Sequence, residues 1–352
     1  MWNDGSGQEP AAGKINVQEA DPIPAEARAE IERLLTSGDL FRYTTPDKAP
    51  VPRLEAEFAA LMGVKYALAV SSCSAALFLS LKALDLPRGA KVLIPAFTFA
   101  AVPSSVLHAE LTPVLVEVDD TMRIDMDDFC ARLPGAGAVM ISHMRGHTSN
   151  MDAIMAACDE AGIPVVEDAA HSLGASWGGR PLGTLGKTGC FSFQSYKLVN
   201  AGEGGMLITD DPELAARAAI MSGAYEANWK THHGLAEIAG KWQKKLPLYN
   251  LRMQNLSAAV VRDVAALIEI AKTQAQDPEQ ALVRRIAQEK LGLVVDFLPQ
   301  SDMPPPGPKP FFSLLDQALS VELRKQIGRP FWIDTVGRSA LVEIRIRLDN
   351  SV

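Results

Sequence analysis

Lys197 stands in a segment whose residue types suit covalent chemistry on a carbonyl group. The segment runs from Phe191 to Gly205, with aromatic residues before the lysine and glycines after it. Burial among apolar side chains would lower the pKa of the amine and leave a nucleophile, which Schiff-base chemistry requires. Considered alone, a lysine in such a place is more often salt-bridged or on the surface.

A pair of carboxylates, Glu167 and Asp168, directly follows the apolar run 164–166 and precedes His171. This position is the buried carboxyl end of a predicted strand. A carboxylate there needs a partner that offsets the loss of water, and we expect a cationic one.

Two further segments could hold parts of a ligand. Small residues from Ser71 to Ala76 lead from a predicted strand into a helix, whose N-terminus could cup a phosphate. Plain N-capping by a serine is the competing interpretation. Phe99 follows another strand and could cover a flat ring, although by itself it reads as a core phenylalanine.

The elements around these residues alternate between apolar strands and helical patterns, which predicts an α/β fold with a mostly parallel sheet flanked by helices. Strands are expected at 66–70, 91–95, 113–118, 138–142 and 164–168, and helices at 74–84, 100–108, 125–133 and 151–161. Strands at 190–193 and 206–209 are joined by a loop too short for a crossover helix, so we expect them to be antiparallel.

Composition excludes several classes of protein. The chain has 352 residues and a formal charge of −8, without a basic stripe for nucleic acid. Charged and polar residues interrupt its most apolar stretch, 61–86, so no membrane-spanning helix is expected. The first ten residues lack an apolar secretory region. Four cysteines without metal-ligand spacing predict reduced thiols, no metal site and a cytoplasmic protein.

Two motif-like segments can be set aside. Gly186-Lys187-Thr188 suggests a P-loop, but Pro181 occupies the place of the motif's first glycine. The pair His232-His233 has no nearby ligand spacing, and we expect it to lie in a solvated loop.

Five ordered motifs together resemble those of the DegT/DnrJ/StrS family of pyridoxal-phosphate sugar aminotransferases. They are Ser72 to Leu77, Pro95 to Phe99, Glu167 to Gly174, Phe191 to Gly205, and Asn250 to Met253. The block that joins Lys197 to Gly-Glu-Gly-Gly is the most specific part, although Val199 stands where the family has Ile or Leu.

The resemblance implies a fold type I homodimer that binds pyridoxal 5′-phosphate, with active sites at the subunit interface. By position, Lys197 is the Schiff-base lysine and Asp168 the partner of the pyridinium nitrogen, which makes the ring an electron sink. His171 matches the residue beside the phenolic oxygen, and Phe99 the stacking aromatic. The phosphate would be contacted by Ser72, Cys73, Ser74 and Ser192, and by Asn250 of the other subunit.

The chain departs from the family pattern in three places. Cys73 replaces a glycine, and residues 144–147 (Met-Arg-Gly-His) stand where relatives often have Leu-Tyr-Gly. The C-terminal part is short. We expect a flexible tail at 1–14, a large cofactor-binding domain at 15–270 and a shortened α+β domain at 271–352, in which 341–348 forms a strand.

The resemblance implies transfer of an amino group from an amino acid, with glutamate favoured, to a keto-sugar that is nucleotide-linked. This reaction would serve polysaccharide, amino-sugar or secondary-metabolite biosynthesis. One alternative is a sugar dehydratase of the family, against which Lys197 argues, because those relatives carry histidine there. Another is a cofactor-binding regulatory protein without turnover.

Overall fold

The computed structural model describes residue 23 and residues 25–46, 48–232, 234–262, 331–335 and 342–346. The chain divides into two units, Ile23–Thr273 and Met1–Pro22 with Gln274–Val352. The expected tail 1–14 lies outside the described residues. The domain boundary at 270/271 stays a prediction.

A seven-stranded sheet forms the centre of the larger unit, in the order β1-β9-β8-β5-β4-β2-β3. Its strands are β1 Tyr66–Val70, β2 Lys91–Pro95, β3 Thr112–Val116, β4 Ala136–Ser142, β5 Val165–Asp168, β8 Thr188–Ser192 and β9 Gly205–Thr209. Neighbouring strands are parallel except where β9 pairs with β1 and β8. The mostly parallel sheet and its antiparallel β8–β9 pair confirm the expectations from the sequence.

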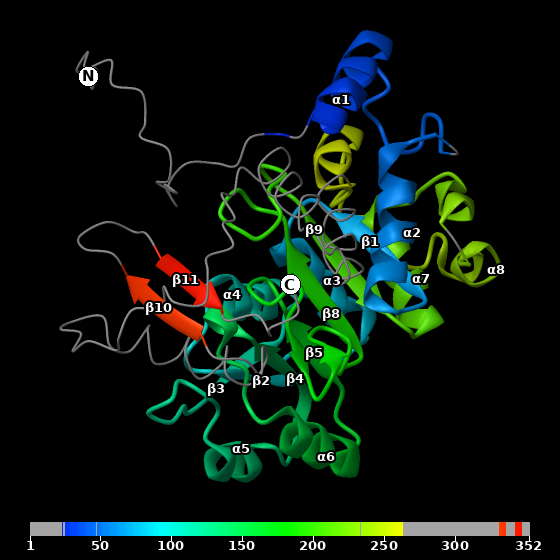
Figure 1. Ribbon diagram of the computed structural model, residues 1–352. Helices are drawn as coiled ribbons and strands as arrows, with labels where there is room; N and C mark the ends of the chain where they lie inside the picture. Colours follow the sequence, from blue (N-terminus) through cyan, green and yellow to red (C-terminus); the bar gives the residue numbers. More distant parts are fainter. Residues whose placement is uncertain are drawn as a thin grey trace, which may run out of the picture. The chain divides into compact units, whose positions relative to one another are not determined.

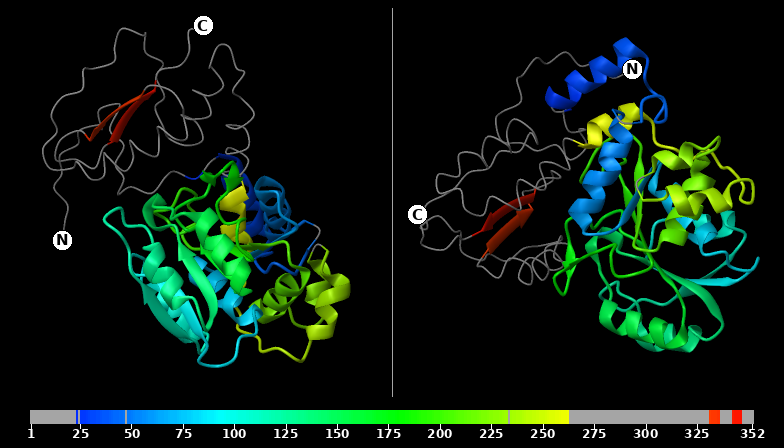
Figure 2. Two further views of the ribbon diagram at one scale, coloured as in Figure 1. Left: turned by 90° about the horizontal axis from the view of Figure 1, so that it is seen from below. Right: turned by 90° about the vertical axis from the view of Figure 1, so that its right-hand side faces the viewer.

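Helices cover both faces of this sheet (Figures 1 and 2). The described helices are α1 Ala25–Ser37, α2 Pro50–Met62, α3 Cys73–Ala83, α4 Ala101–His108, α5 Met126–Arg132, α6 Met151–Ala161, α7 Pro212–Gly223 and α8 Ala236–Ala239. On one face α3, α4 and α7 share a core with β1, β2 and β9. On the other face α2 packs on the β8–β9 end, while α5 and α6 pack on β2, β4 and β5.

Local sequence signals set the limits of these elements. Helix α2 begins at Pro50 and has Pro52 in its first turn, where the N–H that proline lacks would have no partner within the helix. The helix ends at Met62, and Gly63, with a φ of 68°, forms its left-handed C-cap. Helix α3 begins after Ser72, whose hydroxyl accepts a hydrogen bond from the Ala75 amide. This capping fixes the loop between β1 and α3.

Short elements complete the larger unit. They are the two-residue strands β6 Ser176–Trp177 and β7 Arg180–Pro181, and the 3-10 helices η1 Met144–Gly146, η2 Asn228–Thr231 and η3 Gly240–Trp242. Residues 255–262 are helical. The apolar pattern of the sequence predicts a longer helix, 256–273, and the rest of it lies outside the described residues.

The second unit contains an antiparallel pair of strands, β10 Phe331–Thr335 and β11 Val342–Ile346. Strand β11 confirms the strand expected at 341–348, where apolar and charged residues alternate. Its partner β10 was not expected from the sequence. The sequence also predicts a loop or linker in the Pro-rich run 302–310 and a helix at 314–327, and both segments lie outside the described residues.

The expectation of a solvated loop at His232 is wrong. His232 is 4% exposed, and its Nε2 lies 2.8 Å from the Tyr43 hydroxyl. It belongs to a buried polar cluster in which Arg42 donates to the Glu55 carboxylate at 2.8 Å. Sequence spacing missed this cluster because its members lie far apart in the chain.

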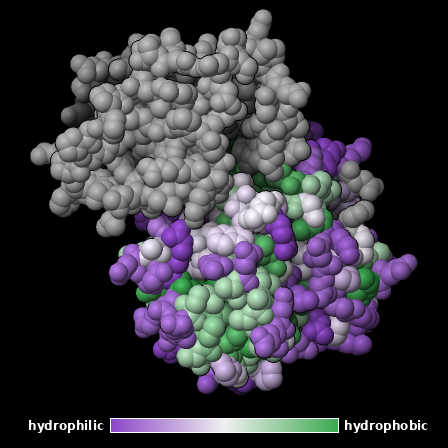
Figure 3. All heavy atoms as spheres, turned by 60° about the horizontal axis from the view of Figure 1, so that its bottom comes forward, coloured by the Kyte–Doolittle hydropathy of each residue, from purple (hydrophilic) through white to green (hydrophobic). Residues whose placement is uncertain are grey.

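The surface mixes polar and apolar side chains. On the face drawn in Figure 3, apolar residues form a patch that polar residues border. No helix among the described residues is long and apolar enough to cross a membrane. The cytoplasmic location expected from the sequence stays a prediction.

Candidate active site

The carboxyl ends of the parallel strands meet at one edge of the sheet, and the residues singled out in the sequence gather there. In open α/β sheets this edge is where ligands bind. Ser72 and Cys73 follow β1, Phe99 follows β2, and Asp168 ends β5. We take this edge as the candidate active site.

Lys197 lies in the loop between β8 and β9, where its Nζ is 2.7 Å from Nε2 of His171. Burial lowers the pKa of the lysine, and the carboxylate of Asp168 only partly opposes that effect. Burial and then the charge of Lys197 lower the pKa of His171 as well. The lowered pKa of His171 favours a neutral imidazole. The Lys197 amine that contacts it releases its proton more readily than an ordinary lysine.

Asp168 is 5% exposed and accepts hydrogen bonds from three neutral donors. The Ser142 hydroxyl donates to Oδ2 at 2.8 Å, and the Ala170 amide donates to Oδ1 at 3.2 Å. The Cys73 thiol lies 3.8 Å from Oδ1. Among the described residues no cation forms an ion pair with Asp168. Neutral donors offset the burial of this carboxylate, while the expected cation, Lys197, interacts with it through its charge.

The thiol of Cys73 points toward Asp168. Burial, followed by the charge of Asp168, raises its pKa far above the ordinary value, so the sulfur stays protonated and acts as a weak donor. The replacement of glycine by cysteine thus adds a third neutral donor to the carboxylate.

The phosphate-binding site predicted from the sequence corresponds to the N-terminus of α3. The Ser72 hydroxyl caps the Ala75 amide at 3.1 Å, which confirms N-capping. Capping does not exclude anion binding, because the amides of Cys73 and Ser74 find no acceptor in the described part of the chain. A Cβ on Gly205 would lie 2.3 Å from the Ser72 backbone, so only glycine lets β9 approach this site so closely.

Phe99 is 60% exposed, so its interpretation as a core phenylalanine is wrong. An exposed ring at the edge of the site is free to stack on a planar ligand. Ser192 ends β8, and its hydroxyl accepts a weak hydrogen bond from the Gln194 amide at 3.4 Å.

Asn250 belongs to a segment that runs beside the end of β1. The Ser71 amide donates to the Leu251 carbonyl at 2.8 Å, and Asn250 itself is exposed with a φ of 56°. The guanidinium of Arg252 braces the segment by donating to the Gly223 carbonyl at 2.9 Å. Within its own chain Asn250 is therefore close in the fold to the loop that carries Ser72.

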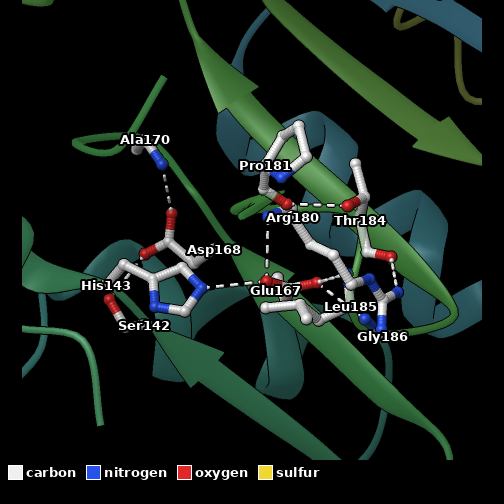
Figure 4. Close-up of polar contacts among 11 residues, drawn as sticks. Ser142, His143, Glu167, Asp168, Ala170, Arg180, Pro181, Thr184, Leu185 and Gly186 are labelled. Carbon is white, nitrogen blue, oxygen red and sulfur yellow. Dashed lines mark hydrogen bonds and ion pairs between the residues drawn. The ribbon is translucent and has the colours of Figure 1, made fainter. Parts of the chain in front are cut away.

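Glu167, the residue before Asp168, fixes the end of β5 through contacts on the other side of the strand from Asp168 (Figure 4). Its carboxylate is fully buried and lies 3.0 Å from His143 Nε2. It also accepts hydrogen bonds from the amides of Gly183, Leu185 and Gly186, at 2.8, 2.7 and 2.7 Å. Burial raises the pKa of Glu167, but these hydrogen bonds outweigh burial and lower it below the ordinary value.

Two of the residues that shape the site were not identified from the sequence. Ser142 bonds Asp168 and His143 bonds Glu167, and both come at the end of the strand expected at 138–142. The rule that ligand-binding residues follow strand ends, applied to this strand as well, would have found them.

The donor set fits pyridoxal 5′-phosphate. It contains an amine with a lowered pKa for the aldehyde, a buried carboxylate for the ring nitrogen, free amides at a helix N-terminus for the phosphate, and an exposed aromatic ring for stacking. An α/β sheet with this set at its carboxyl edge has the fold of the type I pyridoxal-phosphate-dependent transferases.

Comparison with known proteins gives the family. Residues 23–303 match the DegT/DnrJ/EryC1/StrS aminotransferase family, and the chain belongs to it. Pyridoxal 5′-phosphate is the cofactor that this membership indicates.

Named relatives act in sugar metabolism. The chain is 37% identical over 245 residues to the spore coat polysaccharide biosynthesis protein SpsC of Bacillus subtilis. This match covers 68% of this chain and 60% of SpsC. It is 36% identical to a UDP-N-acetyl-3-dehydro-alpha-D-glucosamine 3-aminotransferase of Acidithiobacillus ferrooxidans, over 59% of this chain and 54% of that protein. The crystal structure of DesI with its TDP-sugar product superposes with a TM-score of 0.61 at 31% identity, over 72% of this chain and 61% of DesI.

The chain thus matches between about half and three-fifths of the length of these relatives. The family match, residues 23–303, includes the strand ends and loops that form the candidate site.

Proposed function

We propose that this chain is a pyridoxal-phosphate-dependent aminotransferase that moves an amino group from an amino acid, such as glutamate, to a nucleotide-linked keto-sugar. The observation that carries the proposal is Lys197, which contacts His171 at the edge where Asp168 ends its strand. Relatives named for polysaccharide biosynthesis and for a UDP-sugar aminotransferase support the substrate class.

Each residue has a distinct part in this proposal. Bound pyridoxal phosphate would supply an aldehyde and an electron-withdrawing ring. The Nζ of Lys197, whose pKa burial lowers, would hold the cofactor through that aldehyde, whose oxygen leaves as water. The amine, once released, would carry a proton as general base and then acid. His171 Nε2 accepts a hydrogen bond from Nζ and orients the amine.

The remaining residues bind and orient the cofactor. Asp168 would face the ring nitrogen with its negative charge, supported by donors from Ser142 and Cys73. Phe99 would stack on the ring and exclude water from it. The phosphate would lie at the N-terminus of α3 against Ser74, within reach of Ser72, Cys73 and Ser192.

Labelling of Lys197 tests the proposal. Purified protein incubated with pyridoxal phosphate should absorb in the visible region, and borohydride should fix the cofactor to Lys197, as peptide mapping would show. L-glutamate should bleach the band before reduction. Lys197→Ala should bind cofactor without a covalent link and without transamination, whereas Lys187→Ala, on a lysine of the loop before β8, should behave as the parent.

The alternatives give different results. A binding protein without turnover would take up the cofactor and stay yellow with glutamate and every keto-sugar offered. A dehydratase would release water from its sugar without net amino transfer. Label on another lysine would refute the site assignment.

We further propose that the chain forms a homodimer in which Asn250 reaches the partner's cofactor. Exposed apolar side chains flank Lys197, namely Tyr196 and Leu198 at 69% and 65% exposure, and a second subunit would cover them. Sedimentation at working concentration checks this proposal, and a catalytically active monomer would refute it.

A further inference from the structure

The loop that follows β4 places an arginine at the edge of the candidate site. Ser142, the last residue of β4, bonds the Asp168 side chain, and the His143 amide donates to the Asp168 carbonyl at 3.0 Å. The loop then turns through η1, where Arg145 has a φ of 51°. Arg145 therefore lies three residues after a strand end that is fixed to Asp168.

Both sides of this loop are fixed. The amides of Gly146 and His147 donate to the carbonyls of His143 and Met144, each at 3.0 Å. The His147 ring packs edge-on against Phe97, with 5.9 Å between ring centroids, and Phe97 belongs to the loop that carries Phe99. A left-handed conformation costs a non-glycine residue energy, and it is maintained here by these contacts.

Among the described residues, the side chain of Arg145 has no anionic partner. It is exposed and forms no ion pair or hydrogen bond among the described residues. The charge of Arg145 acts on His171 and Lys197. Burial is the main cause of the lowered pKa values of these two groups, and Arg145 lowers both values further. The negative charge of Asp168 acts on the same two groups in the opposite direction and offsets part of this repulsion. An anion bound at Arg145 would offset more of it.

We propose that Arg145 is a specificity-determining residue that binds an anionic group of the substrate at the mouth of this site, an inference that rests on the proposed function. The group bound would carry two oxygens that share a negative charge. Such a group can accept two parallel hydrogen bonds from the planar guanidinium. Two sources fit this chemistry, the carboxylate of the amino donor and the diphosphate of the nucleotide-linked sugar.

Binding of two probes to the full chain loaded with pyridoxal phosphate distinguishes the sources. Glutarate represents the donor carboxylates, UDP represents the diphosphate, and calorimetry measures the affinity of each. Arg145→Gln should weaken binding of at least one probe about tenfold or more, the loss expected for a charged hydrogen bond. Loss for glutarate alone assigns the donor carboxylate, and loss for UDP alone assigns the diphosphate.

Two further variants separate charge from folding. Arg145→Gly removes the side chain and relieves the positive φ, so it should fold and lose the same affinity. Arg88→Gln is the control, because Arg88 precedes the opposite end of β2 and pairs there with Glu110 at 3.2 Å. It should bind both probes as the parent does.

Unchanged affinity for both probes in Arg145→Gln and Arg145→Gly would overturn the inference, as would a parent that binds neither probe. Failure of the proposed function would look different, because then borohydride would fix no cofactor to Lys197 in the parent.

Discussion

Removal of the negative charge of Glu167 should destabilise the protein although Glu167 is not proposed to touch substrate or cofactor. The carboxylate is completely buried and faces four donors: His143 Nε2 and the amides of Gly183, Leu185 and Gly186. In Glu167→Gln one oxygen can still accept from Leu185 and Gly186. The new amide group replaces the oxygen that faces Gly183 and His143.

The expected cost follows from these contacts. His143 can change tautomer and accept from the new amide, but the Gly183 amide then faces another donor. A buried donor left without an acceptor costs about 1–3 kcal/mol, and the two remaining bonds lose the strength that the negative charge gives them. We expect Glu167→Gln to lower the free energy of unfolding by about 2–3 kcal/mol. Glu167→Ala removes all acceptors and should cost about 4 kcal/mol or more.

Urea unfolding followed by far-UV circular dichroism measures these changes. The control is Glu160→Gln, an exposed position in α6, which should stay within about 0.5 kcal/mol of the parent. If Glu167→Gln were as stable as this control, the assignment of Glu167 as the acceptor that fixes the end of β5 would be wrong.

Other predictions concern the site and the buried polar cluster. Asp168→Asn should still bind cofactor, as its absorbance would show, but lose nearly all transamination, since a neutral amide cannot keep the ring nitrogen protonated; turnover within a few-fold of the parent would make Asp168 structural. Labelling of Lys197 by pyridoxal phosphate and borohydride should reach half its maximal rate below pH 10.5, because burial lowers the pKa of the amine; a midpoint at or above that value would contradict the assigned environment. With the thiol reagent DTNB, the exposed Cys130 should react in the native protein, whereas Cys73 should react only after unfolding. Burial lowers the pKa of His232 well below 6.5, so below pH 6.5 the unfolded chain binds a proton that the folded protein does not. The free energy of unfolding should therefore fall with decreasing pH by about 1.4 kcal/mol per unit more in the parent than in His232→Gln, and equal slopes would rule out this role.

Much of the fold could be predicted because its signals are local. The buried strands are short apolar runs, and the loop expected from Ser195 to Gly205 is too short for a crossover, so the β8–β9 pair had to be antiparallel. The motifs at strand ends located Lys197 and Asp168 at one edge. In a parallel sheet the carboxyl ends of the strands lie at the same edge, and this does not depend on how the side chains pack.

The side-chain partners could not be predicted, because they depend on which residues of separate elements meet. The neutral donors to Asp168 come from β4 and α3, and the exposure of Phe99 depends on how its loop leaves β2. The same holds for His232, whose partner Tyr43 is far away in the sequence. A histidine in a polar stretch gives no local sign that tertiary contacts bury it.

The alternation of side chains along β5 explains how two adjacent carboxylates have different roles. Successive residues of a strand point to opposite faces, so Glu167 and Asp168 diverge although they are neighbours in sequence. The parallel register pairs Ser142 with Asp168, and the next residue, His143, meets Glu167. One carboxylate thus accepts the amides of a loop and keeps the strand end in place. The other is free to face a ligand, and this division requires two consecutive acidic residues at the end of one buried strand.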